Sequence, residues 1–115
     1  MADDLIFHMC RREEWQAALT HGAYAGSSQD RADGFIHFST RDQIVESAAR
    51  HRAGQDGLLL LAVDPTALGP ALKWEPSRNG QMFPHLHGEL LPSAVRWAHE
   101  LPLDPGGRHR FPPLD

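Results

Sequence analysis

Two short segments of this chain place histidine inside apolar runs, where a strand core normally carries Val, Ile or Phe. The first, residues 34–40, reads GFIHFST, and the second, residues 83–88, reads FPHLHG. Each imidazole brings two ring nitrogens that need hydrogen-bond partners, and a buried nitrogen without a partner costs about 1–3 kcal/mol. Two such segments in one small chain predict a polar cleft built on a sheet, with His37 and His85 on facing walls.

His37 and Ser39 are two residues apart, which places both side chains on one face of an extended strand. An imidazole and a hydroxyl that share one space suit the binding of a ribose or a phosphate group. The alternative is structural. His37 would then bond a backbone carbonyl, and Ser39 would belong to the cap of the helix that follows.

Residues 83–88 carry two further histidines, His85 and His87, which point the same way if the segment is extended. Pro84 fixes one backbone angle, and an amide bond before proline is one that can adopt the cis form. Two same-side imidazoles, with His37 as a third, form the kind of set that zinc prefers. The ligand spacing is irregular and no supporting carboxylate is visible, so we expect no tight metal site. The alternative is one structural and one exposed histidine.

Trp74 and Glu75 end a short predicted strand just before a loop. The indole would stack on a base or a nicotinamide ring, and the carboxylate would bond sugar hydroxyls. The alternative places Trp74 in the core and pairs Glu75 with Arg78 or a backbone N–H. His8 lies in an apolar strand beside the predicted centre of the sheet, and the same two interpretations apply to it.

The composition limits the class of protein. The chain has 115 residues, of which 41% are hydrophobic and 23% charged, which is enough for one domain with one core. A net charge of −4 with scattered acidic residues argues against nonspecific binding to duplex DNA. The single cysteine, Cys10, excludes a disulfide framework. The longest uncharged apolar run, residues 57–63, is too short to span a membrane, and the N-terminal segment MADD is acidic where a signal peptide is basic. We therefore expect a cytoplasmic protein of bacterial type.

The hydrophobic periodicity predicts an α+β domain over residues 1–101, with a twisted and mostly antiparallel sheet. The predicted strands are 5–9, 34–38, 58–63, 72–75 and 95–101, and the predicted helices are 12–20 and 41–51. Two polar segments, 25–33 and 76–80, are predicted loops, and 82–91 is an edge strand or an ordered loop because Pro84 and Gly88 interrupt it. Residues 102–115 form a tail rich in Pro and Gly, loosely attached unless Phe111 docks.

Several of these motifs together resemble a small bacterial family known only as domain of unknown function 952. They are Glu14-Trp15 on the first predicted helix, residues 34–40, Trp74-Glu75 and residues 83–88. The resemblance covers residues 5–101 and names no activity. That family is in turn similar, more distantly, to the ADP-ribosyltransferase-like fold. In that fold, two small, strongly twisted antiparallel sheets hold NAD in the cleft between them.

The distant resemblance implies roles for single residues. His8 matches the first-strand histidine that holds a ribose of NAD, and His37 falls near the second-strand aromatic that stacks near nicotinamide. Glu75 or Glu89 would supply the late glutamate that stabilises an oxocarbenium-like centre. A branch that resembles the RNA 2′-phosphotransferases uses histidine and arginine without that glutamate, and the histidines of this chain fit it slightly better.

We therefore expect a histidine-lined cleft that binds NAD, ADP-ribose or a related nucleotide or phosphorylated ligand. Its reaction would be a transfer of ADP-ribose or of a phosphoryl group, or cleavage at the anomeric carbon. The alternatives are a noncatalytic ligand-binding or interaction module on a degenerate version of the fold, and a histidine metal site. The expected catalytic residues are His37, Glu75 and Glu89, and the expected ligand-binding residues are His8, Ser39, Trp74, His85 and His87.

Overall fold

The computed structural model describes residues 4–77 and 80–114. In chain order, the strands are β1 (Ile6–Arg11), β2 (Ile36–His37), β3 (Ser39–Thr40), β4 (Leu58–Val63), β5 (Leu72–Pro76), β6 (Met82–Leu86) and β7 (Val95–Glu100). The helices are α1 (Arg12–His21), α2 (Ser28–Asp33) and α3 (Arg41–His51), with the 3₁₀ helices η1 (Pro65–Ala71) and η3 (Pro92–Ala94). The predicted α+β class is confirmed.

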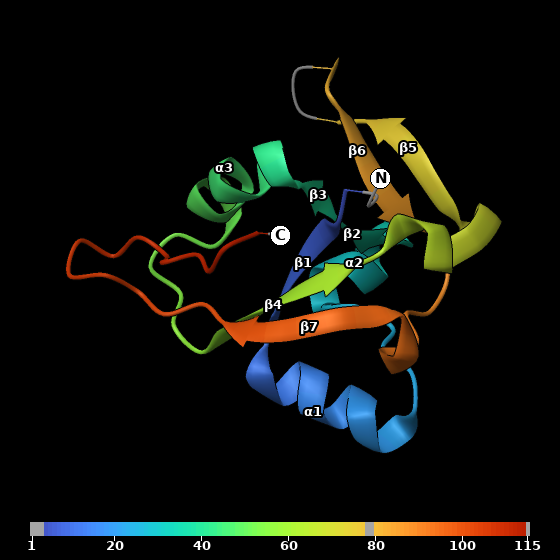
Figure 1. Cartoon of the computed structure of the whole chain (residues 1–115), viewed down its shortest axis with the longest axis horizontal. Helices are drawn as coiled ribbons and strands as arrows, with labels where there is room; N and C mark the ends of the chain where they lie inside the picture. Colours follow the sequence, from blue (N-terminus) through green and yellow to red (C-terminus); the bar gives the residue numbers. More distant parts are fainter. Residues whose placement is uncertain (1–3, 78–79, 115) are drawn as a thin grey trace.

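These strands form two antiparallel sheets, seen one beside the other in Figure 1. The larger sheet has the strand order β3-β1-β4-β7, and the smaller sheet has the order β2-β6-β5. β1, β4, β5, β7, α1 and α3 begin and end within two residues of the predicted bounds. Periodicity alone was therefore sufficient to find the elements that carry an apolar face.

The core lies on both faces of β4, and all six residues of this strand are buried. Leu59, Leu61 and Val63 face a cluster that includes Trp15 of α1, and the intervening residues face a second cluster around Ile44 of α3. β1 pairs with β4 along its whole length. The residues of β1 alternate between the same two clusters, with Ile6 and Cys10 in the first and Phe7 in the second.

The segment predicted as one strand over residues 34–38 is divided between the two sheets. Ile36 and His37 form β2 and pair with β6, whereas Ser39 begins β3 and pairs with β1. The chain crosses from one sheet to the other at Phe38, which is buried and whose N–H donates to the carbonyl of Pro84 at 3.0 Å. The expectation that His37 and Ser39 lie on one strand is therefore wrong.

Residues 28–33, predicted as part of an exposed loop, form helix α2. Its N-terminus carries a capping box. The N–H of Asp30 donates to Ser27 Oγ at 3.3 Å, and the N–H of Ser27 donates to Asp30 Oδ2 at 2.8 Å. Six mostly polar residues have no apolar periodicity, so the pattern that revealed the other helices is missing here. Asp30 is only 3% exposed.

β6 lies between β2 and β5, so the prediction of an edge strand or loop for this segment is also wrong. Pro84 has no N–H to donate, but its carbonyl points toward the end of β2, where pairing stops at His37. The proline is tolerated because the neighbouring strand is too short to need the missing donor. No cis peptide bond occurs in the described ranges, so the bond between Phe83 and Pro84 is trans.

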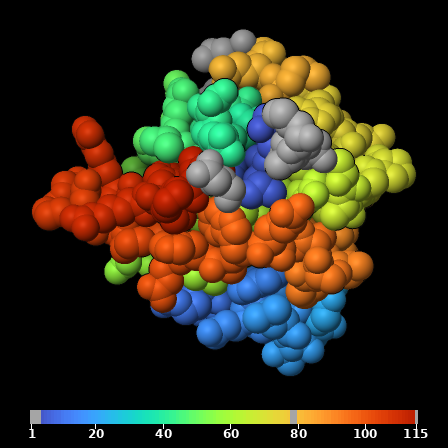
Figure 2. Space-filling model, viewed as in Figure 1, coloured from blue at the N-terminus to red at the C-terminus, as the bar shows by residue number. Residues whose placement is uncertain are grey.

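The C-terminal tail is attached to the domain. Phe111 and Leu114 pack against the core cluster around Ile44, and Arg41 donates to the carbonyl of Leu114 at 3.0 Å. Figure 2 shows the tail lying against α3 and β7. Residues 1–3 of the acidic N-terminal segment and residues 78–79 of the predicted loop lie outside the described residues. Within the described ranges, no helix has the length and apolarity needed to cross a membrane.

Candidate functional site

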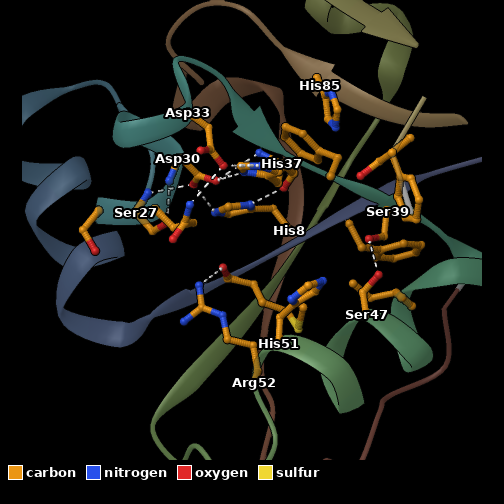
Figure 3. Close-up of a pocket in the computed structure, with 18 of the residues that line it drawn as sticks. His8, Ser27, Asp30, Asp33, His37, Ser39, Ser47, His51, Arg52 and His85 are labelled. Atoms are coloured by element: carbon orange, nitrogen blue, oxygen red, sulfur yellow. Dashed lines mark hydrogen bonds and ion pairs between the residues drawn. The ribbon is translucent and has the colours of Figure 1, made fainter. Parts of the chain in front are cut away.

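A cavity of about 500 Å³ lies beside the crossing from β2 to β3. This volume is within the usual range for small-molecule sites. Side chains from both sheets, α2 and α3 surround it, and Figure 3 shows how they converge. Its polar lining includes His8, Asp30, Asp33, His37, Ser39, Ser47, Arg52 and His85.

His37 lies between two carboxylates at this cavity. Asp30 Oδ1 is 2.5 Å from Nδ1 of the ring and also accepts from the backbone N–H of His37 at 3.1 Å. Asp33 Oδ2 is 3.0 Å from Nε2. Each nitrogen of the ring thus faces one carboxylate oxygen. The side chain of His37 is 39% exposed and that of Asp30 only 3%, so a buried acid orients an accessible imidazole.

Asp30 is held ionised by its partners. Burial by itself would raise the pKa of this carboxyl, but the hydrogen bonds from the His37 ring and from the N–H groups of Ser27 and His37 outweigh burial and lower the pKa to about 2. A carboxylate that accepts from two backbone N–H groups and one ring is fixed in position. Asp30 therefore links the start of α2 to β2.

His8 holds the backbone of His37 in position. Its Nδ1 donates to the backbone carbonyl of His37 at 2.6 Å, and its Nε2 accepts from the hydroxyl of Tyr24 at 2.7 Å. This pair of contacts selects one neutral tautomer, and burial lowers the pKa of the ring. Both nitrogens of His8 are occupied. His8 thus acts on the cavity through the position of His37 and has no nitrogen left for a ligand.

His37 and His85 are direct neighbours, opposite each other on β2 and β6, with ring centroids 5.5 Å apart. They share one wall of the cavity, which corrects the expectation of facing walls.

Glu75 Oε1 accepts from His85 Nδ1 and from His87 Nε2, each at 2.8 Å. Burial lowers the pKa of His85 despite this bond, and the Phe35 ring stacks on it at 4.1 Å.

The structure brings four of the predicted residues to the cavity and leaves four outside its lining. His8, His37, Ser39 and His85 line it, and Ser39 Oγ lies 2.9 Å from Ser47 Oγ. Trp74 is 47% exposed on β5, and Glu89 borders a separate shallow depression. Glu75 bonds both His85 and His87, but neither Glu75 nor His87 lines the cavity. Arg78, the alternative partner for Glu75, lies outside the described residues.

Sequence reasoning missed Asp30, Asp33 and Arg52. The spacing of Ser27 and Asp30, a hydroxyl with an acid three residues later, was the one signal that could have located α2 and its buried carboxylate. No comparable signal pointed to Arg52.

Cys10 is a free and buried cysteine. Burial raises the pKa of the Cys10 thiol to about 12, so this cysteine is not an activated nucleophile.

Carboxylates contact three of the histidines, whereas the sequence showed no supporting carboxylate for a metal site. In the described part of the chain, however, no group of three or more His, Cys, Asp or Glu side chains is placed to hold a metal ion.

A family model described as "Protein of unknown function (DUF952)" matches residues 9–98. The chain belongs to the DUF952 family. Among solved structures, it is similar to the X-ray crystal structure of Protein CC0527 from Caulobacter crescentus, with 47% identity, a TM-score of 0.89 and coverage of 92% of this chain and 93% of that chain. The solution NMR structure of CC0527 gives 48% identity, a TM-score of 0.81 and coverage of 90% of each chain. No curated protein matches this DUF952 chain.

Gly26 tests the placement of Asp30. Its φ is +99°, and a Cβ added there would lie 2.6 Å from Cβ of Asp30. Gly22 has a similar φ of +88° but open space around it. We expect Gly26→Ala to lower the free energy of unfolding by about 1–3 kcal/mol more than Gly22→Ala, because only the first displaces the carboxylate from its buried partners. Urea denaturation of both variants measures this, and equal losses would contradict it.

The buried histidines predict how stability changes with pH. The pKa of His8 is lowered in the folded protein, so below its ordinary value of about 6.5 the unfolded chain takes up a proton that the folded chain does not. The free energy of unfolding should therefore fall between pH 7 and pH 5, by at most about 1.4 kcal/mol per pH unit for each such histidine. His8→Gln should show a shallower slope than the unaltered protein in urea denaturation at several pH values. Parallel slopes would contradict a neutral His8.

Proposed function

We propose that this DUF952 protein binds a small phosphorylated ligand that carries a sugar, of the nucleotide, ADP-ribose or NAD class. The observation that carries the proposal is the pair of Asp30 and His37, in which a buried ionised acid orients an accessible imidazole at the wall of a 500 Å³ cavity. Asp30 holds Nδ1 of this ring, so Nε2 donates to a phosphate or hydroxyl oxygen of the ligand when that oxygen replaces the exposed Asp33 carboxylate. The oxygens of Asp33 and Ser39 add acceptors for sugar hydroxyls.

The distant resemblance to the ADP-ribosyltransferase-like fold supports NAD and ADP-ribose as the first ligands to test. Proteins of that fold hold NAD between two small antiparallel sheets. This chain also has two antiparallel sheets, and its cavity lies where the chain crosses between them at Phe38. In our proposal His37 contacts the ligand directly, whereas His8 acts through the carbonyl of His37.

A transfer or cleavage reaction is the second candidate, and Asp33 is the observation that favours it. Its carboxylate lines the cavity next to His37, whereas Glu75 and Glu89 do not line it. With NAD bound, the bond from C1′ to nicotinamide would break and nicotinamide would leave with the electron pair. Water, or an acceptor hydroxyl, would bond to C1′ and release its proton to solvent. Asp33 would stabilise the positive charge that develops at the sugar.

The first experiment is a thermal-shift screen with NAD, ADP-ribose, nucleotides, phosphorylated RNA ends and divalent metals. A ligand at one hundred times its dissociation constant should add about 2.7 kcal/mol of apparent stability. Release of nicotinamide from NAD would identify an enzyme, and binding without release would identify a noncatalytic module. Stoichiometric zinc in protein purified without added metal would favour the metal site instead.

His37→Asn tests the residue that carries the proposal. Its amide retains a donor for Asp30, so we expect the free energy of unfolding to change by no more than about 1 kcal/mol. Affinity for the ligand found in the screen should fall by about 10-fold or more, because the imidazole is lost. His99→Asn is the control, since His99 is an exposed strand histidine outside the cavity lining. Unchanged affinity in His37→Asn, measured by calorimetry, would refute the proposed role.

A further inference from the structure

The charged groups around the cavity are not evenly matched. Asp30 and Asp33 both contact His37. Glu14 accepts from the N–H of Arg11 as part of the cap of α1. Unlike the His37 ring, the guanidinium of Arg52 bonds no acid among the described residues but only neutral acceptors. They are Gln55 Oε1 and the carbonyl of Met9, each at 3.2 Å.

Arg52 therefore keeps a positive charge that no acid neutralises. Among residues 4–77 and 80–114, no carboxylate lies within ion-pair distance of its nitrogens. A guanidinium has five N–H donors, and the two bonds leave the others available. Such a group binds phosphate well, since its planar fork matches two phosphate oxygens.

The position of Arg52 explains how its charge is supported without an acid. It is the C-cap residue of α3, and its N–H donates to the carbonyl of Ala48 at 2.9 Å. The C-terminal end of a helix carries a partial negative charge and stabilises a cation. The C-terminal end of α3 therefore stabilises the positive charge of Arg52, which lines the cavity.

The cavity thus has two ends of opposite character. Asp30, Asp33 and His37 lie at one end, and Arg52 lies across from them together with His51 (Figure 3). Ser47 lines the cavity from the same face of α3, four residues before His51. A ligand with hydroxyls at one end and a phosphate at the other would satisfy both.

We propose that Arg52 is the phosphate subsite of this cavity, so that the ligand binds with its phosphate at the end of α3 and its sugar toward Asp33. This inference rests on the proposed function for the sugar end only. The subsite itself recognises a phosphate or diphosphate group, and an uncharged nucleoside leaves it without a partner. Adenosine should therefore bind more weakly than ADP-ribose.

The test uses calorimetry with pyrophosphate, ADP-ribose and adenosine on three variants. Arg52→Gln retains a donor but removes the charge, and Arg52→Lys retains the charge. Arg50→Gln is the matched control, because Arg50 lies on the same helix, pairs with Glu46 and is outside the lining. Affinity for pyrophosphate and ADP-ribose should fall by about 10- to 100-fold in Arg52→Gln, the usual effect of losing hydrogen bonds to a charged group. It should fall less in Arg52→Lys and stay unchanged in Arg50→Gln.

A measurement on the unaltered protein guards against a variant that fails to fold. The ¹⁵N-labelled Nε–H signal of Arg52 should shift when pyrophosphate is added, and that of Arg50 should not. If ADP-ribose binds Arg52→Gln as tightly as the unaltered protein, the subsite is wrong and the proposed function stands. If pyrophosphate binds through Arg52 but no nucleotide or ADP-ribose binds, the subsite stands and the proposed function is wrong. If none of them binds, both are wrong.

Discussion

The candidate site depends on one buried carboxylate. Asp30 accepts hydrogen bonds from the N–H of Ser27, from the N–H of His37 and from the His37 ring. Without these donors, burying an ionised acid would be strongly unfavourable. With them, a six-residue helix that has no apolar stripe is anchored to a two-residue strand. The same contacts orient the His37 ring at the cavity. Asp30 therefore determines both the local fold and the position of the imidazole.

The two sheets are joined at the same point. His37 belongs to the smaller sheet, yet its carbonyl accepts from His8 of the larger sheet, and Phe38 carries the chain between them. Tyr24 completes the set by donating to His8. A group bound at His37 therefore contacts a residue that both sheets position. These polar residues are part of the architecture, because the hydrogen bond from His8 to the carbonyl of His37 joins the two sheets.

The sequence predicted the elements whose periodicity reflects packing, and it failed where pairing in space decides the structure. The aliphatic run of β4 and the stripes of α1 and α3 have distinct patterns, so their bounds were nearly correct. Two-residue strands have no periodicity, so the division of residues 34–40 between sheets was not visible. Histidine in apolar runs did place His37 and His85 at one cavity, although they lie on the same wall and not on facing walls. The pairing of these histidines with Asp30 and Glu75 was not predicted, since Asp30 comes from a segment whose composition resembles a loop and Glu75 meets His85 through the register of β5 with β6.

The Phe35 ring has a consequence for spectroscopy. It lies 4.1 Å from the His85 ring at an angle of 24°, and its centroid is 4.7 Å from that of His37 and 5.1 Å from that of His87. Protons above the face of a phenyl ring are shielded by its circulating electrons. The imidazole C–H signals of these three histidines should therefore be displaced from one another and from those of exposed histidines such as His99. One aromatic residue thereby makes these three histidines separately observable in solution.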